Sequence, residues 1–227
     1  RAVADRLGIE LREVDLRREF SVIVEYFLNE YARGRTPNPC IRCNPMIKWG
    51  ILLERALELG ADAFATGHYV RLYFVENRQR TILARSHYRE KDQSYALWRL
   101  GQNQLARTRF PLEGHDKQEV RALAAKAGLE IATKADSQDV CFIPDDDYKR
   151  FIVEILEARG ETIEPGDILD KYGAVLGRHK GYPFYTIGQR KGLRIALGRP
   201  VFVTRIDPET NRIWVGDQEE LYAPGLV

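Results

Sequence analysis

The sequence predicts an α/β fold followed by a smaller, mainly β domain. Helix-like and strand-like segments alternate up to about residue 144, whereas short β-like pieces punctuated by glycine follow Gly160. The chain has 227 residues, 44% of them hydrophobic, which is enough for one large domain or two modest ones with their own cores. We therefore expect two domains, with the second beginning near residue 145.

The first segments follow the pattern of an α/β unit. Residues 1–7 are helix-like and end at Gly8, and residues 9–16 are strand-like. Residues 17–33 form a second predicted helix that ends at Gly34.

A third helix and a buried strand are predicted after a proline-rich loop. Asn44 suits a helix N-cap and Pro45 the first helical position, which predicts a helix from about residue 45 to residue 59, before Gly60. Residues 61–66, ADAFAT, are nearly continuously apolar, as in a strand that a parallel sheet buries on both faces. In such a sheet the ligand-binding loops lie at the strand ends.

Beyond this strand the sequence predicts a hairpin and three amphipathic helices. The alternating runs of residues 70–85 turn near Asn77. Residues 91–100 and 116–129 form the first two helices. Residues 144–160 form the third, with acidic side chains correctly placed at its positive N-terminal end.

Charge is distributed unevenly, although the net charge is only +2. Residues 145–170 carry nine acidic side chains against three basic ones, whereas residues 171–206 carry eight Lys or Arg and no acid. Basic groups neutralise phosphates, and aromatic rings can stack on single-stranded bases. Aromatic residues interleave this acid-free stretch: Tyr172, Tyr182, Phe184, Tyr185 and Phe202. A nucleic-acid surface and an ordinary solvated β surface with a few core aromatics both fit the pattern.

The chain contains three cysteines and no run of about 18 apolar residues that would mark a membrane span. An odd cysteine count without a leader-like segment favours a reducing, cytoplasmic setting in which the thiols serve chemistry. Cys43 would lie directly before the predicted N-cap, where unpaired N–H groups, the helix dipole and Arg42 stabilise a thiolate. Cys141 follows acidic residues and precedes Phe142, a less activating setting that also fits a buried, inert thiol.

Three kinds of cysteine site compete. Structural zinc needs four ligands, so it would recruit a histidine in addition to Cys40, Cys43 and Cys141. A Cys-x-x-Cys redox pair is disfavoured because the prolines around it indicate a rigid loop. A sulfur relay needs two cysteines that meet in space, one of which carries a persulfide that the other resolves. The spacing of the residues does not decide among the three.

Five motifs, in this order, resemble the tRNA-specific 2-thiouridylases of the MnmA/TrmU family. They are GRTPNPCIRCNPMIKWG, ATGHYVRL, KDQSYALWRL, KADSQDVCFIPDDDY and GYPFYTIGQRKGLRIALGRPVFV, and they span nearly the whole chain. Each short motif alone would fit an ordinary cap or turn, so their joint order carries the resemblance. It implies the remainder of a Rossmann-like PP-loop domain (adenine nucleotide alpha hydrolase-like) over residues 1–144. A small, mainly β central domain that binds tRNA (145–198) and the start of a C-terminal β-barrel (199–227) would follow.

The resemblance also implies a reaction. Such enzymes use ATP, with Mg²⁺ expected beside it, to adenylate the C2 oxygen of the wobble uridine in certain tRNAs. A cysteine persulfide then delivers sulfur while AMP leaves. The implied partners are tRNA and a cysteine desulfurase or sulfur-relay protein, and no membrane partner is expected.

Residue by residue, the resemblance implies that Cys43 is the nucleophile and Cys141 the persulfide carrier. The two cysteines would form a disulfide in one stage of turnover. The residues implied to lie against the target base are Asn38, Pro39 and Cys40.

Nucleotide and tRNA contacts are implied in the same way. Gly67 matches an ATP contact and His68 a tRNA contact. Lys91, Asp92 and Gln93 match a further segment that contacts tRNA. The acid-free stretch then falls where the family holds tRNA, in accord with its charge.

Two departures from the family pattern qualify these expectations. The sequence opens on Arg1 inside a predicted helix and lacks both the SGGVDS-type phosphate loop and much of the barrel. We therefore expect an internal part of a longer enzyme, inactive by itself. Many members also have Asp where this chain has Cys40, and a thiol with its ordinary pKa of about 8.5 replaces a carboxylate poorly in acid–base chemistry.

Two alternative functions stay open. Cys40, Cys43 and Cys141 could ligate three irons of an iron–sulfur cluster in a different PP-loop thiolase. Alternatively, the chain could bind tRNA without catalysing any reaction.

Overall fold

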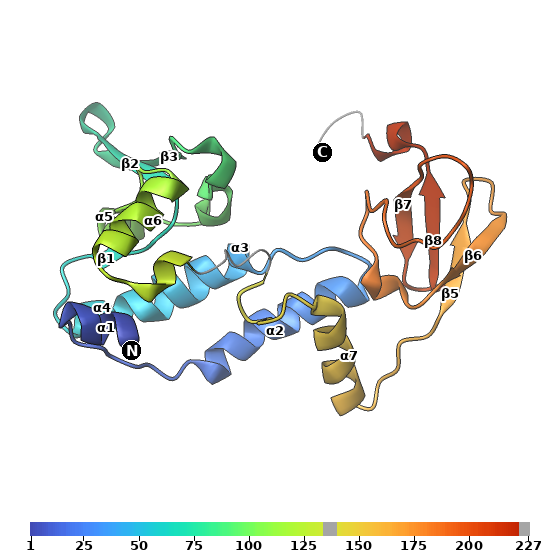
Figure 1. The fold of residues 1–227 in the computed structure, drawn as a ribbon, viewed down its shortest axis with the longest axis horizontal. Helices are drawn as coiled ribbons and strands as arrows, with labels where there is room; N and C mark the ends of the chain where they lie inside the picture. Colours follow the sequence, from blue (N-terminus) through green and yellow to red (C-terminus); the bar gives the residue numbers. More distant parts are fainter. Residues whose placement is uncertain (134–139, 223–227) are drawn as a thin grey trace. The chain divides into compact units, whose positions relative to one another are not determined.

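The chain forms two units in the computed structural model, which describes residues 1–133 and 140–222 (Figure 1). The first unit comprises residues 1–23 and 39–136, and the second comprises residues 24–38 and 137–227. The residues KADSQD of the fourth sequence motif and the terminal APGLV lie outside the described residues.

Helices make up the first part of the first unit. α1 (Ala2–Leu7) ends at Gly8 with φ 62°, and α2 (Arg17–Ala32) starts in this unit, so the first two predicted helices are confirmed. One long helical segment then comprises α3 (Cys40–Cys43), η1 (Asn44–Leu52) and α4 (Leu53–Glu58). It ends where predicted but begins earlier than predicted.

Two pairs of strands follow this helical segment. β1 (Phe64–Ala65) pairs in parallel with β4 (Thr108–Arg109), so only two of the six residues predicted as a buried strand pair as one. β2 (Val70–Val75) and β3 (Arg80–Arg85) pair antiparallel around the turn η2 (Glu76–Arg78), which confirms the predicted hairpin.

Short helical pieces complete the first unit. The predicted helix over residues 91–100 is wrong: the chain forms the single turns η3 (Arg89–Lys91) and η4 (Ser94–Leu97) instead. Three further pieces follow: α5 (Gln102–Ala106), α6 (Lys117–Lys126) and η5 (Glu130–Thr133). α6 confirms the helix predicted there, and its N-cap Asp116 and the side chain of Glu119 form a capping box.

The predicted strand over residues 9–16 is also wrong, because these residues are irregular. A strand persists only where a neighbouring strand satisfies its backbone groups. Within the described residues, β1 pairs with β4 alone, and no strand lies beside residues 9–16.

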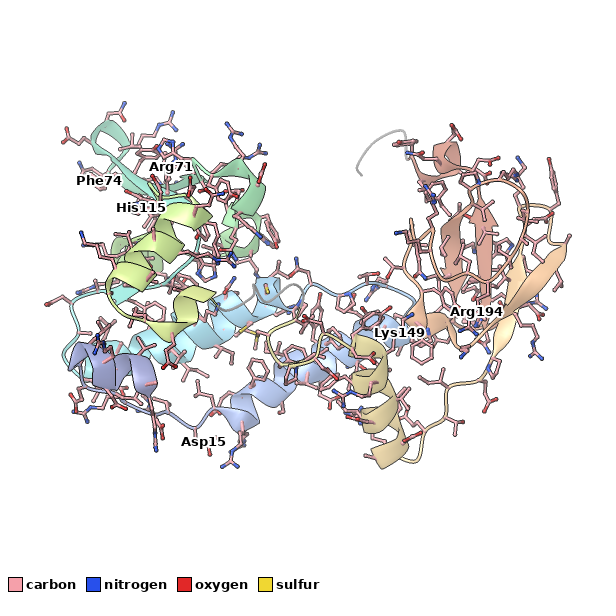
Figure 2. All side chains as sticks on the ribbon, in the orientation of Figure 1. Asp15, Arg71, Phe74, His115, Lys149 and Arg194 are labelled. Carbon is pink, nitrogen blue, oxygen red and sulfur yellow. The ribbon has the colours of Figure 1, made fainter. Side chains whose placement is uncertain are left out.

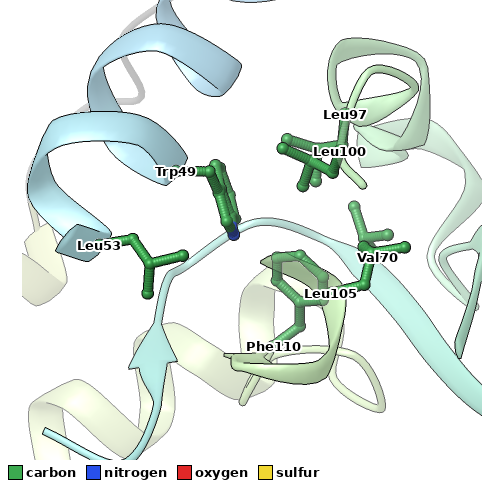
Figure 3. Packing of buried hydrophobic residues seen from close by; sticks show 7 residues of the cluster. All are labelled: Trp49, Leu53, Val70, Leu97, Leu100, Leu105 and Phe110. Atoms are coloured by element: carbon green, nitrogen blue, oxygen red, sulfur yellow. The ribbon is translucent and has the colours of Figure 1, made fainter. Parts of the chain in front are cut away.

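Figure 3 shows the core of the first unit, in which the indole of Trp49 is packed between helix and loop residues. The buried members of this cluster are Trp49, Leu53, Val70, Leu97, Leu100, Leu105 and Phe110. Trp49 is only 1% exposed, and its Nε1 donates a 2.7 Å hydrogen bond to the Thr108 hydroxyl, which in turn donates to the Gln104 carbonyl. The large apolar ring is therefore buried with its one polar atom satisfied.

The second unit contains the end of α2, the helix α7 (Tyr148–Ala158) and a four-stranded sheet. The strands are β5 (Gly166–Leu169), β6 (Val175–His179), β7 (Phe202–Asp207) and β8 (Arg212–Gly216), in the order β6-β5-β8-β7. Single turns precede and follow the last two strands: η6 (Tyr182–Phe184) and η7 (Gln218–Leu221). Since β5 pairs in parallel with β8, the predicted boundary between residues 198 and 199 falls inside this sheet.

Two apolar clusters stabilise the second unit. One packs the sheet around Ile168, Val203 and Ile213, none of which is measurably exposed. The other packs α2 against α7, where the rings of Tyr31 and Tyr148 stack with centroids 5.3 Å apart. α7 is confirmed as the third predicted amphipathic helix.

Candidate functional site

The two cysteines of the TPNPCIRCNP motif lie on the first turn of a helix. α3 follows Pro39, whose φ of −64° already suits a helix, and the Cys43 N–H donates to the Pro39 carbonyl at 2.8 Å. The predicted position of Cys43 before an Asn44 cap is therefore wrong, because the helix starts one turn earlier. Cys40 is exposed and Cys43 is half-buried, and both remain within reach of the helix's positive end.

Asn44 connects this helix to the rest of the first unit. Its side-chain amide is only 1% exposed and donates a 3.1 Å hydrogen bond to the Ala96 carbonyl in η4. Its Oδ1 is a buried acceptor without a hydrogen-bond partner among the described residues. Asn44 thus fixes the cysteine-bearing turn on the segment that follows the KDQS motif.

Pro45 explains why the helix widens directly after Cys43. Proline lacks the N–H that an α-helix would use and would clash with the carbonyl four residues before it. The helix is π-helical over η1, and a Cβ at Gly50 would lie only 3.1 Å from the Pro45 carbonyl oxygen. Such π segments are rare in proteins, and those that occur often lie at functional sites.

His68 lies in the loop that follows β1, at the carboxyl end of a parallel strand. It is 8% exposed, its Nδ1 is 2.9 Å from the Thr66 hydroxyl, and its Nε2 is 3.5 Å from the Lys48 ammonium. Burial, followed by the charge of Lys48, lowers the pKa of His68 to about 4. His68 is therefore neutral at pH 7, with Nε2 accepting from Lys48 and Nδ1–H donating to Thr66.

The KDQS motif is bound to the same loop. The Tyr69 N–H donates to Gln93 Oε1 and the Gln93 N–H donates to the Tyr69 carbonyl, both at 3.1 Å. Asp92 accepts 2.7 Å hydrogen bonds from the Ser86 N–H and the Ser94 hydroxyl. These side chains shape the loop from within the unit, whereas Lys91, the first residue of the motif, is exposed.

The resulting site combines exposed backbone with an ammonium group. Gly67 is exposed at the strand end, with Lys48 half-buried behind the neighbouring His68. Exposed backbone and a cation at the carboxyl end of a parallel strand suit an anionic ligand such as a nucleotide phosphate. Sequence reasoning missed Lys48, although its position four residues after Asn44 and eight after Cys40 placed all three on one helical face.

Cys141 belongs to the second unit and is exposed. It lies in a turn closed by a 2.9 Å hydrogen bond from the Ile143 N–H to the Val140 carbonyl. Ile143 is 2% exposed and the ring of Phe142 packs against Phe27, so the neighbours enter the core while the thiol stays outside. The reading of Cys141 as a buried thiol is wrong, whereas its reactivity stays a prediction. Its approach to Cys43, which lies in the other unit, stays a prediction.

Asn38 is half-exposed and belongs to the second unit, whereas Pro39 is buried in the first. Within residues 1–133 and 140–222, no group of three or more His, Cys, Asp or Glu side chains is arranged to hold a metal ion. A zinc or iron–sulfur site on the three cysteines gains no support from this part of the chain.

The acid-free stretch presents its basic side chains at the surface of the second unit. All eight of its Lys and Arg residues are exposed, and four of them approach a carboxylate within 4.0 Å: Lys171, Arg178, Arg199 and Arg205. The other four have no carboxylate partner in the described part of the chain: Lys180, Arg190, Lys191 and Arg194. This unbalanced positive charge suits a polyanion.

The aromatic residues of this stretch contribute less than the sequence suggested. Tyr185 is 8% exposed and packs in the sheet core, and the Tyr182 hydroxyl donates to the Ala32 carbonyl at 2.9 Å. Tyr172, with the Lys171 ammonium 5.4 Å from its ring centroid, is 85% exposed. The core reading therefore holds for Tyr185, while Tyr172 remains open for stacking.

Comparisons with known proteins agree with this architecture. Residues 1–145 match the family described as the tRNA methyl transferase HUP domain, and residues 149–217 match the tRNA methyl transferase PRC-barrel domain. The tRNA-specific 2-thiouridylase MnmA of Carboxydothermus hydrogenoformans is 49% identical over 100% of this chain and 62% of its own length. The MnmA of Salinibacter ruber is 51% identical over 97% of this chain and 58% of its own length. MnmA 1 of Caldanaerobacter subterraneus is 50% identical over 99% of this chain and 61% of its own length.

The fold is therefore a HUP domain of the Rossmann-like PP-loop type followed by a PRC-barrel domain, which defines a class of tRNA-modifying proteins. The chain belongs to the MnmA family of tRNA-specific 2-thiouridylases. It spans about three fifths of the length of the curated relatives it matches. None of the helices in the described residues is long and apolar enough to cross a membrane.

Proposed function

We propose that the protein is a tRNA 2-thiouridylase that replaces the C2 oxygen of the wobble uridine by sulfur at the expense of ATP. The observation that carries this proposal is an identity near 50% with 2-thiouridylases over practically the whole chain. The exposed Cys141 and the half-buried Cys43, both accessible to a reactant, support it further.

Activation of the uridine comes first. The C2 oxygen attacks the α-phosphorus of ATP and pyrophosphate leaves, which converts a poor leaving group into AMP and makes C2 electrophilic. The HUP domain supports the use of ATP. We assign an ATP contact to the exposed Gly67, and Mg²⁺ would accompany the nucleotide phosphates.

Sulfur transfer follows through the two cysteines. The terminal sulfur of a persulfide on Cys141 forms a bond to C2, and AMP leaves with the former oxygen. The Cys43 thiolate then attacks the Cys141 sulfur, which breaks the S–S bond and leaves sulfur doubly bonded to C2. The two cysteines end as a disulfide that an external thiol reduces, and a cysteine desulfurase or relay protein supplies the next sulfur atom.

The remaining predicted residues would hold the tRNA. Asn38, Pro39 and the exposed Cys40 would lie against the target base, and Lys91 would contact the tRNA backbone. Because His68 is only 8% exposed, its proposed role is to order the loop next to the tRNA. Asp92 and Gln93 would act in the same way, and the proposed location is the cytoplasm.

Serine substitutions in the whole enzyme test the proposal. Cys43→Ser and Cys141→Ser should each abolish 2-thiouridine, measured by mass spectrometry of digested tRNA, because each removes one partner of the sulfur transfer. Cys40→Ser should retain activity, because Cys40 is not assigned to the transfer of the sulfur atom and a hydroxyl fits the space of its thiol. Full activity of either of the first two variants would remove that cysteine from the mechanism, whereas loss in all three would favour an iron–sulfur cluster.

Two other functions are separated by simple measurements. The family description names methyl transfer, and the mass of the modified nucleoside distinguishes sulfur-for-oxygen exchange from methylation. A protein that only binds tRNA would bind no ATP, which calorimetry on the whole enzyme decides.

A further inference from the structure

We propose that a groove on the first unit, beside β3, binds an unpaired nucleotide of RNA; this inference rests on the proposed function, because the RNA would be the tRNA substrate. We call this feature the hairpin groove. Its lining includes Arg78, Arg80, Ile82, Leu97, Trp98 and Leu100. None of its lining residues belongs to the loop of His68.

The hairpin groove is formed by fixed parts of the fold. Its volume is about 360 Å³, near the lower end of the range for small-molecule sites. Leu97 and Leu100, which are 1% and 8% exposed, form its apolar floor and belong to the core of the unit. Gln102 closes one side, because its side-chain amide accepts from the Thr81 N–H at 2.8 Å and donates to the Thr81 carbonyl at 2.9 Å. Little reorganisation would therefore oppose binding.

Trp98 supplies a flat aromatic surface at the rim. Its side chain is 67% exposed, whereas Trp49 in the same unit is 1% exposed. The Arg99 guanidinium lies 5.6 Å from the Trp98 ring centroid, a cation–π contact on one side of the ring. Exposed aromatic rings of this kind stack on unpaired bases.

The charge around the hairpin groove indicates that the partner is anionic. Residues 70–85 carry four arginines and a single acid, Glu76. Arg78, Arg80 and Arg99 are exposed and have no carboxylate partner within the described ranges. Figure 2 shows Arg71 on the same hairpin, where its guanidinium lies 5.1 Å from the Tyr73 ring centroid.

An apolar floor, an exposed aromatic ring and guanidinium groups without carboxylate partners together match one class of ligand. A nucleotide offers a flat ring for the floor and for Trp98, and a phosphate for the arginines. A paired base cannot enter, because its faces are already stacked within the helix. We therefore infer a looped-out or single-stranded nucleotide, and an acidic protein partner is an outcome of the test.

The test uses the whole enzyme and an unmodified tRNA transcript. Arg78→Ala with Arg80→Ala should weaken binding roughly tenfold and reduce the slope of log K against log salt by about 1.4, two phosphate contacts at about 0.7 each. Trp98→Ala should weaken binding roughly tenfold, and Trp98→Phe should restore most of it, because a ring can still stack. Arg55→Ala is the matched control, since Arg55 is exposed on the same unit but paired with Glu58.

Competition and fluorescence complete the test. Single-stranded RNA should displace the tRNA. It should also quench the part of the tryptophan fluorescence that is lost in Trp98→Phe. A duplex of equal length should do neither. Unchanged affinity in both variants, or equal competition by the duplex, would overturn the inference. If these variants retain thiolation with an unaltered KM for tRNA, the inference about the groove is overturned and the proposed function stays intact. Binding of the sulfur-donor protein, lost in the same variants, would replace RNA by a protein partner. Absence of tRNA binding and thiolation in the unaltered enzyme would defeat both proposals.

Discussion

A buried histidine next to a lysine determines the charge at the end of β1. The Lys48 ammonium, 3.5 Å from His68 Nε2, repels a proton there, and burial opposes the imidazolium still more. Because the imidazole stays neutral, the ammonium is the only charge of the pair at pH 7. An anion arriving beside Gly67 would then meet a cation whose position the imidazole fixes through a hydrogen bond.

Lys48→Met should raise the pKa of His68 from about 4, though not to its ordinary value of 6.5, because burial is the larger cause. In the unfolded chain His68 takes up its proton near pH 6.5, so stability is lost as the pH falls from about 6.5 to 4. This loss of stability, about 3 kcal/mol, should become smaller in the variant. Histidine NMR titration and urea unfolding across this pH range measure the two effects.

Lys126→Met is the control for this substitution, since Lys126 is an exposed lysine on α6 of the same unit. It should leave the His68 pKa and the pH dependence of stability unchanged. An unaltered His68 titration in Lys48→Met would show that the two side chains do not interact in solution.

At the scale of elements, helix ends show how local chemistry and packing combine. Gly34 follows the end of α2 with φ +68°, and Gly160 follows the end of α7 with φ +73°, a left-handed conformation that favours glycine in both cases. Their surroundings differ. A Cβ at Gly34 would lie 2.8 Å from Ile206 Cγ2 and 3.1 Å from Pro208 Cγ, whereas nothing lies within 4 Å of one at Gly160.

Gly34→Ala should therefore destabilise the second unit more than Gly160→Ala does. Both variants lose about 1–2 kcal/mol because alanine resists positive φ. Only Gly34→Ala adds a clash with β7 and the turn after it, expected to cost about 1–3 kcal/mol more. Thermal unfolding of the two variants measures the difference, and equal losses would show that the end of α2 gives way at no cost.

The elements that sequence reasoning placed correctly depend on local signals. α6 has its Asp116 cap and α2 its glycine stop, and both kinds of signal act within a few residues. The strand predicted over residues 9–16 is wrong because a strand needs a pairing partner, which the sequence alone does not reveal. The helix predicted over residues 91–100 is wrong because the side chains of Asp92 and Gln93 accept hydrogen bonds from the backbone N–H groups of Ser86 and Tyr69. These interactions compete with a helix.

The candidate site was predictable to a similar degree. Family motifs marked Cys43, Gly67 and His68, but the early helix start moved Cys43 inside a turn, because Pro39 and not Asn44 begins the helix. Lys48 escaped notice because its significance comes from a contact with a residue twenty positions away. Pairwise contacts of this kind arise only when the chain folds.

At the scale of the whole molecule, the proposed chemistry requires cooperation between the two units. Cys43 belongs to the first unit, while Cys141 belongs to the second unit and is exposed. The proposed sulfur transfer needs the two thiols to meet, and we expect bound tRNA to favour that arrangement.

Mild oxidation of the whole enzyme by diamide should therefore link Cys43 to Cys141, and bound tRNA should accelerate the reaction. Peptide mass spectrometry identifies the link. Cys40→Ser should leave it in place, whereas Cys43→Ser should abolish it, because only the half-buried thiol is assigned to the attack. The neighbouring Cys40 and Cys43, one helical turn apart, offer an internal competitor. If the only disulfide found joins Cys40 to Cys43, with or without tRNA, the two units do not bring the assigned sulfurs together and the relay fails.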